Sequence, residues 1–259
     1  MKFIKILLII SLCVLNTAFG RESLPKAFAD DFMLGVGDFG AVFSDFGCGA
    51  WAIPLFAVGT TGGAMLLDDE IRLASDNRRT IFLLKQAGEP VYTIGASVGI
   101  WLTGYFADSP EWRTTGRLIA ETFVLAGAVN IGLKYALGRS RPCLDEGNHR
   151  FGFAEFDDSR QSMPSGHTTT AFAAATVLAE RIGNIYASIA LYALACGTAC
   201  ERVIADRHWF SDVILGAEIG YFSARAICTA SERGQTNRDA VFLPLIAPDY
   251  VGFQTLVRF

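Results

Sequence analysis

A first group of residues able to bind an anion lies at the end of an apolar stretch. Lys134 and Arg141 are two helical turns apart, and Pro142 follows directly. Because an α-helix has 3.6 residues per turn, both cations can point toward the same place at the helix end. Proline stops the helix and fixes the direction in which the chain leaves it. The same spacing also occurs where basic residues only anchor a helix end in solvent.

A second segment, Pro164-Ser165-Gly166-His167, precedes an alanine-rich apolar stretch. A turn of this composition that opens a helix presents unpaired backbone N–H groups and the positive end of the helix dipole. Anions bind at such termini, and a glycine lets a ligand approach the backbone closely. His167 would then stand beside the anion. An ordinary helix start capped by Ser165 has the same sequence.

The third segment runs from Arg202 through His208 to Asp212. A histidine and an aspartate four positions apart can share one helix face. A carboxylate held against one imidazole nitrogen fixes the tautomer and leaves the other nitrogen free to attack an electrophile. Arg202 adds a planar donor group that suits phosphate oxygens. A surface His–Asp pair is the alternative for this segment alone.

Together, the three segments resemble the type 2 phosphatidic acid phosphatase superfamily. Its motifs KxxxxxxRP, PSGH and SRxxxxxHxxxD occur in this order between Lys134 and Asp212. One position departs from the pattern, because Glu201 stands where the third motif begins with serine. This glutamate can pair with a neighbouring arginine, or its charge can weaken phosphate binding. The resemblance implies an all-α bundle of about six apolar helices.

The resemblance also implies a role for each motif residue. His208 attacks phosphorus and forms a phosphohistidine, while Asp212 orients the imidazole. His167 protonates the leaving alkoxide and then activates water. The oxygens of the phosphoryl group are held by Lys134, Arg141, Arg202 and the backbone N–H groups of Ser165 and Gly166. The expected activity is therefore hydrolysis of phosphate monoesters or pyrophosphates.

Fixed cations stabilise a phosphoryl transition state without a metal, so no metal and no cofactor are expected. An apolar bundle favours lipid phosphates such as phosphatidate, phosphatidylglycerol phosphate or a polyprenyl diphosphate. A soluble periplasmic acid phosphatase acting on small phosphate esters is the alternative. Vanadium-dependent haloperoxidases resemble the same motif set but have longer chains. The last alternative is an envelope protein that has lost its catalytic activity, as the replacement of the motif serine by Glu201 would indicate.

The elements that must position these residues are helices. Apolar runs of helical length cover residues 50–67, 90–106, 114–137, 168–182, 185–203 and 211–228. The long connectors are 68–89 and 138–163, and long loops in compact domains are often functional. Half of the 259 residues are apolar, the net charge is −4 and no basic tract occurs, so nucleic acid is not an expected partner.

Membrane association is expected from the uncharged stretches, some of which are long enough to cross a bilayer. Glu121, Glu180 and Glu218 interrupt other helices and must face the bundle interior to be tolerated in lipid. Glycine pairs at helix-packing spacing, Gly59 with Gly63 and Gly95 with Gly99, predict close helix approach.

The ends of the chain differ from the bundle. Residues 1–20 have a positive start, a short apolar core and small residues before Arg21, which predicts a cleaved export signal. An uncleaved first membrane helix is the alternative. Residues 21–240 would form the phosphatase domain, in the membrane with a periplasm-facing site or in the periplasm of a bacterial envelope. Residues 241–259 alternate in polarity, which predicts a short strand-like tail.

Overall fold

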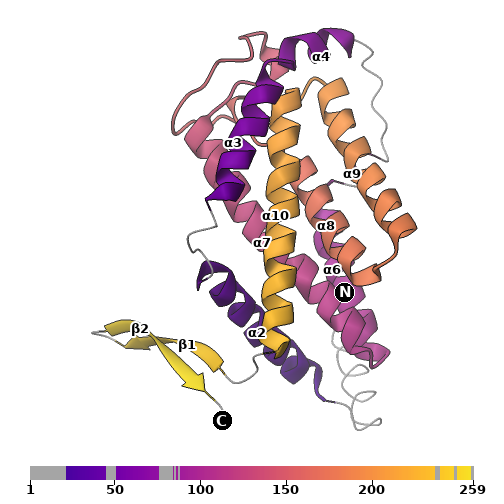
Figure 1. Ribbon diagram of the computed structural model, residues 1–259, viewed down its shortest axis with the longest axis vertical. Helices are drawn as coiled ribbons and strands as arrows, with labels where there is room; N and C mark the ends of the chain where they lie inside the picture. Colours follow the sequence, from indigo (N-terminus) through magenta and orange to yellow (C-terminus); the bar gives the residue numbers. More distant parts are fainter. Residues whose placement is uncertain are drawn as a thin grey trace, which may run out of the picture.

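The computed structural model describes residues 22–44, 51–75, 84, 86, 88–236, 240–247 and 250–257. Long helices run up and down a bundle (Figure 1): α2 (Leu24–Ser44), α3 (Ala52–Met65), α6 (Pro90–Phe106), α7 (Pro110–Leu137), α8 (Gly166–Ile182), α9 (Ile185–Ile204) and α10 (Phe210–Thr236). The short helix α4 (Asp68–Ala74) follows α3. Two short turns, η1 (Pro142–Leu144) and η2 (Asp158–Arg160), lie in the loop between α7 and α8.

The predicted all-α fold is confirmed, and each of the predicted apolar runs coincides with a helix from α3 to α10. Helix α10 is central and packs against α2, α3, α7, α8 and α9. The tail forms an antiparallel hairpin of β1 (Ala240–Ala247) and β2 (Tyr250–Val257), in which Ala240 pairs with Val257. Helix α2 was not among the predicted helices.

The outer surface of the bundle is strongly apolar. Leu55 and Val58 on α3 are each 71% exposed, and Val91 on α6 is 73% exposed. Soluble monomers rarely expose large apolar side chains in such continuous faces. Three of the described helical segments are long and apolar enough to cross a membrane: Pro110–Leu144, Ile185–Ile204 and Phe210–Gly234. The fold is therefore that of a membrane protein.

Glu121, Glu180 and Glu218, the acidic residues that interrupt the apolar helices, each have a partner in the bundle. Glu121 on α7 accepts a 2.8 Å hydrogen bond from Arg117, which also pairs with Asp38 of α2. Glu218 on α10 accepts hydrogen bonds from two threonines of α3. Glu180 on α8 pairs with an arginine of α10 at 2.7 Å. Partnered carboxylates are far less costly inside a membrane domain than isolated ones.

Close helix approach occurs at glycines other than the predicted ones. A Cβ atom added at Gly59, Gly63, Gly95 or Gly99 would meet nothing within 4 Å, so the prediction for these pairs was wrong. On α10, a Cβ at Gly216 would lie 2.6 Å from the Ser165 carbonyl oxygen, and one at Gly220 would lie 2.4 Å from the Thr169 carbonyl oxygen. These two glycines allow α10 to pack directly against the start of α8.

Gly138 gives α7 its sharp end. It adopts a left-handed conformation, with φ of 51°, and its N–H donates to the Lys134 carbonyl oxygen. A Cβ here would lie 1.6 Å from the Gly152 carbonyl oxygen, so no other residue fits. Because the loop after α7 folds back over the helix end at this point, Arg139 and Arg141 enter the bundle instead of pointing into solvent.

Candidate active site

The three motif segments meet at one end of the bundle, where α7 ends, α8 begins and α9 turns into α10 (Figure 1). Backbone hydrogen bonds join them. The Ser165 N–H donates to the Asp212 carbonyl oxygen at 3.0 Å, and the Ser162 N–H donates to the Arg139 carbonyl oxygen at 2.8 Å. The structure therefore brings together residues that the sequence separates by up to 78 positions, from Lys134 to Asp212.

His208 is buried, with 4% of its surface exposed, at the start of α10. Its Nδ1 lies 2.7 Å from the Ser162 carbonyl oxygen and 3.7 Å from Oδ2 of Asp212. A carbonyl can only accept a hydrogen bond, so Nδ1 carries the hydrogen and Nε2 has a free lone pair. Ser162, which sequence reasoning missed, is thus the nearer of the two groups that fix the tautomer.

The pKa of His208 is lowered to about 4, chiefly because burial disfavours the imidazolium, and the charges of Lys134 and Arg141 lower it further. The hydrogen bond to Asp212 acts in the opposite direction. His208 is consequently neutral at and well below pH 7. A neutral imidazole whose free nitrogen lies in the field of two cations can act as a nucleophile toward an anionic electrophile.

Asp212 belongs to a buried charge cluster that the sequence did not reveal. Arg139 has no exposed surface, and its guanidinium pairs with Asp212 and with Asp68 of α4, both at 2.7 Å. The second oxygen of Asp212 accepts hydrogen bonds from the Trp209 N–H at 2.8 Å and from the Ser162 hydroxyl at 2.5 Å. Asp212 is thereby fixed in orientation and kept ionised beside the imidazole.

Asp68 also fixes the start of α10. Its Oδ1 accepts the Ser211 N–H at 2.8 Å, and its Oδ2 accepts the Ser211 hydroxyl at 2.7 Å. A carboxylate at a helix N-terminus satisfies an otherwise unpaired N–H and interacts favourably with the helix dipole. Residue 68 was predicted only as the start of a charged connector. A tertiary contact across 143 positions gives it its role.

The predicted phosphate-binding cations differ in how far their charge is already compensated. Lys134 donates to the Gln161 carbonyl oxygen, a neutral partner. Arg141 pairs with Asp158 at 2.9 Å, but that carboxylate is 86% exposed and its attraction is screened by solvent. Lys134 and Arg141 therefore keep most of their ability to attract an anion.

Arg202 is compensated by the residue before it. Its Nε and Nη2 both donate to Oε2 of Glu201, which is 2% exposed. The other carboxylate oxygen, Oε1, is buried and has no hydrogen-bond partner among the described residues. The departure from the family motif thus places a carboxylate on the guanidinium group that is expected to bind phosphate.

Replacing Glu201 with serine is expected to tighten the binding of inorganic phosphate about tenfold, because one charge-assisted contact contributes about 1.5–3 kcal/mol and Arg202 regains it. Titration calorimetry of the detergent-solubilised protein measures the change in Kd. The matched control is Glu70→Ser on the exposed part of α4, which leaves Kd unchanged. An unchanged or raised Kd in Glu201→Ser would show that Glu201 does not compete with phosphate.

The start of α8 differs in one respect from its predicted role. The Ser165 N–H is already donated to the Asp212 carbonyl oxygen, and its hydroxyl accepts a 3.0 Å hydrogen bond from Thr168. Gly166 begins the helix, where N–H groups lack intrahelical acceptors. The backbone donor positions offered to an anion therefore begin at Gly166, and Ser165 instead ties α8 to α10.

His167 is half-buried on the first turn of α8, and its Nε2 lies 3.1 Å from Oε1 of Glu89. Burial lowers the pKa of His167, and the nearby charge of Arg202 lowers it further, while Glu89 and Glu201 act in the opposite direction. Each of the two motif histidines is therefore within electrostatic reach of cations. No motif pointed to Glu89, which lies 78 positions before its partner.

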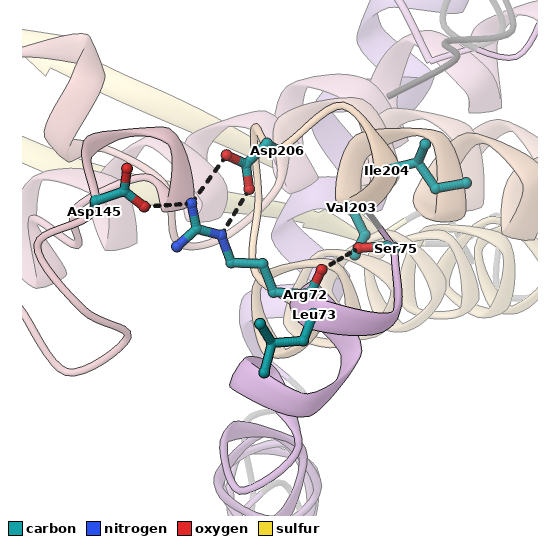
Figure 2. Close-up of a pocket in the computed structure, with 7 residues that line it drawn as sticks. All are labelled: Arg72, Leu73, Ser75, Asp145, Val203, Ile204 and Asp206. Atoms are coloured by element: carbon teal, nitrogen blue, oxygen red, sulfur yellow. Dashed lines mark hydrogen bonds and ion pairs between the residues drawn. The ribbon is translucent and has the colours of Figure 1, made fainter. Parts of the chain in front are cut away.

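Arg72, which lies outside the motifs, also forms ion pairs at this end of the bundle. Figure 2 shows Arg72 of α4 between Asp145 of the long loop and Asp206 of the link from α9 to α10, at 2.7 and 2.9 Å. The guanidinium also lies 5.4 Å from the Trp209 ring centroid, and the carboxylates raise its pKa. The cluster borders a cavity of about 300 Å³ and joins three segments that support the site.

The described residues contain no group of three histidine, cysteine or acidic side chains arranged to hold a metal ion. The prediction that catalysis needs no metal stays a prediction. His149 lies exposed in the long loop and takes no part in the converging segments.

Known proteins are similar to this chain over the region that contains the three motif segments. Residues 116–234 match the PAP2 superfamily. The chain is 37% identical over 122 residues to a lipid A 1-phosphatase of Porphyromonas gingivalis, which covers 45% of this chain and 24% of that protein. It is 36% identical over 110 residues to a lipid A 1-phosphatase of Rhizobium johnstonii, which covers 40% of this chain and 43% of that protein. The chain thus spans less than half the length of these relatives.

Two solved structures share the fold. The crystal structure of Aquifex aeolicus LpxE is similar with a TM-score of 0.51 and 21% identity, over 63% of this chain and 95% of that chain. A transmembrane PAP2 type phosphatidylglycerolphosphate phosphatase from Bacillus subtilis is similar with a TM-score of 0.56 and 19% identity, over 70% and 95%. All three motif segments lie within residues 116–234, the part of the chain that matches the PAP2 superfamily.

Proposed function

We propose that the protein is a PAP2-type phosphatase that hydrolyses phosphate monoesters or pyrophosphates of lipids through a phosphohistidine on His208. The observation that carries this proposal is the state of that histidine. Its Nδ1 is held by the Ser162 carbonyl, which leaves Nε2 unprotonated in the field of Lys134 and Arg141. These are the requirements for attack on a phosphoryl group.

In the first step, Nε2 of His208 attacks phosphorus, and the bond from phosphorus to the leaving oxygen breaks. His167 donates a proton to that oxygen. In the second step, His167 accepts a proton from water, whose oxygen attacks phosphorus and breaks the N–P bond. Asp212 and its partner Arg139 keep the imidazole of His208 in place through both steps.

The cations stabilise the charge that spreads over the phosphoryl oxygens. Lys134 and Arg141 can bind these oxygens directly, and Gly166 adds a backbone N–H at the positive end of α8. Arg202 joins them once the substrate displaces Glu201. Fixed donors of this kind typically lower the barrier most, because they need no reorganisation during the reaction.

Phosphorylated lipids are the substrate class that the surroundings favour. An apolar pocket of about 140 Å³ lies between α6, α7 and α8, and Gly166 forms part of its wall with Phe123 and Ile131. A lipid chain in this pocket would place its phosphate at the start of α8. The relatives named as lipid A 1-phosphatases are consistent with this class.

The proposal is tested by phosphate release from three substrates in detergent micelles: a lipid A 1-phosphate, phosphatidylglycerol phosphate and p-nitrophenyl phosphate. The lipid substrates should have the higher kcat/KM, and rapid quenching should trap a phosphoenzyme that is labile to acid and stable to base. No phosphate release from any of the three would overturn the proposal. Preference for the p-nitrophenyl ester would replace lipids with small esters as the substrate class.

The two ends of α6 support a proposal for the orientation of the bundle in the membrane. Glu89, at its start, contacts His167, whereas the Tyr105 hydroxyl, near its end, donates to the Glu22 carbonyl oxygen at 2.7 Å. The helix has 17 residues, which corresponds to a length of about 25 Å. Thr236 is the last residue of α10, and His208 precedes its first residue, Phe210, so the two lie at opposite ends of this helix. Glu22 and Thr236 thus share one end, and the site occupies the other.

The predicted periplasm-facing site therefore requires Glu22 and Thr236 on the cytoplasmic side. The predicted signal, residues 1–20, lies outside the described residues. Because cleavage would leave Arg21 on the outer face, we infer that signal cleavage and an outward-facing site do not occur together. A periplasm-facing site predicts that a fluorescent protein fused after Phe259 fluoresces in the cytoplasm and that residues 1–20 are retained. A dark fusion with Arg21 as the mature N-terminus would place the site in the cytoplasm.

A further inference from the structure

Glu89, the residue before α6, directs its side chain to another helix. Glu89 occupies the N-cap position of α6, yet its side chain makes no capping hydrogen bond. Instead, Oε1 lies 3.1 Å from Nε2 of His167, on a different helix. Pro90 follows as the first residue of the helix and needs no acceptor for a backbone N–H. The carboxylate therefore contacts His167 and does not cap α6.

The residues just before Glu89 in the sequence hold it in this position. A Cβ atom at Gly88 would lie 2.7 Å from the carbonyl oxygen and 2.9 Å from the Cβ of His167, so only glycine allows this approach. Four positions earlier, the Leu84 carbonyl oxygen accepts a 2.9 Å hydrogen bond from the hydroxyl of Thr198 on α9. The segment before α6 is therefore packed onto both α8 and α9 beside the histidine.

The charged groups that face His167 come from two elements. Arg202 and Glu201 face it from α9, and Glu89 faces it from the segment before α6. Glu201 and Arg202 compensate each other through their ion pair, and of the two carboxylates that act on His167, Glu89 is the one that contacts the imidazole directly. An ionised carboxylate can only accept, so Nε2 carries the hydrogen and Nδ1 is left to exchange a proton with another group.

We propose that Glu89 is a positioning residue for the acid–base histidine, His167, and that it holds Nε2–H and stabilises the imidazolium form that protonates the leaving oxygen. The inference rests on the proposed phosphatase function. In the phosphorylation step, the proton moves from Nδ1 of His167 to the leaving oxygen as the His208–phosphorus bond forms. In the hydrolysis step, water returns a proton to Nδ1.

The test uses two substrates that differ in their need for an acid. A lipid phosphate has an alkoxide leaving group that must be protonated, whereas p-nitrophenolate leaves without protonation. General acid catalysis typically contributes about 10²–10⁴-fold. We therefore expect Glu89→Gln to lower kcat/KM for the lipid phosphate about 30-fold and for p-nitrophenyl phosphate less than about 3-fold. This parameter reports formation of the phosphohistidine and not its hydrolysis.

A pH profile supplies a second measurement that a structural role would not change. Removing the carboxylate destabilises the imidazolium, so the alkaline limb of kcat/KM for the lipid phosphate should move to lower pH. Glu70→Gln, on the exposed part of α4, is the matched control and should leave kcat/KM unchanged for both substrates. Equal losses on both substrates, or an unmoved alkaline limb, would overturn the proposal. Wild-type protein inactive on both substrates would instead overturn the proposed function.

Discussion

Replacing His208 with alanine is expected to abolish phosphate release, with a fall in kcat/KM of about 10⁴-fold or more, because the reaction loses its nucleophile. The side chain is buried, and its Nδ1 is fixed by the Ser162 carbonyl, so no neighbouring group can replace it. The measurement is release of inorganic phosphate from a lipid phosphate in micelles, together with trapping of the phosphoenzyme. The variant should show neither.

The matched control for this prediction is His149→Ala. His149 is exposed in the long loop and lies apart from the converging motif segments, so activity should stay within about twofold of wild type, as for other surface changes. Binding of inorganic phosphate by His208→Ala, measured by calorimetry, should persist because the cations remain. Phosphate release by His208→Ala at the wild-type rate would contradict the phosphohistidine mechanism.

The largest effect on stability is expected at Arg139, which lies between two residues of the first motif. Arg139→Met keeps the length of the side chain and removes its charge. Asp68 and Asp212, both 0% exposed at their side chains, would then be buried without their partner. Breaking a buried ion pair in this way costs about 3–5 kcal/mol. Thermal or denaturant unfolding in detergent should show a loss of this size in the free energy of unfolding.

Arg141→Met, two positions further on, is the matched control. Its partner Asp158 is largely exposed, and solvent-exposed ion pairs contribute about 0–1 kcal/mol. This variant should therefore unfold nearly as wild type but bind phosphate more weakly. Arg139→Met should lose stability and, through the displaced Asp212, activity as well. Similar unfolding free energies for the two variants would show that the buried cluster does not hold the site end together.

The helices were predictable because each buries or exposes a long apolar run. Helix α6 begins and ends where the hydropathy predicts, at Pro90 and Phe106. Helix α7 begins four residues before its predicted start, since its first turn contains Glu111 and Arg113 and is not apolar. Helix α2 escaped prediction because acidic residues interrupt its apolar pattern. Its Asp31 pairs with Arg113 at 3.0 Å, a contact that only the folded chain provides.

Residue types and spacing were enough to predict the residues that carry the chemistry: Lys134, Arg141, His167, Arg202, His208 and Asp212. The folded chain brings them to one end of the bundle and sets which of their charges are already compensated. Lys134 meets only a carbonyl, Arg202 is held by Glu201, and Asp212 is shared with Arg139. Burial makes an unpaired charge costly, so each buried ion must find a partner. Asp68 and Glu89 lie far along the chain from the residues they pair with, so local spacing in the sequence could not predict these contacts.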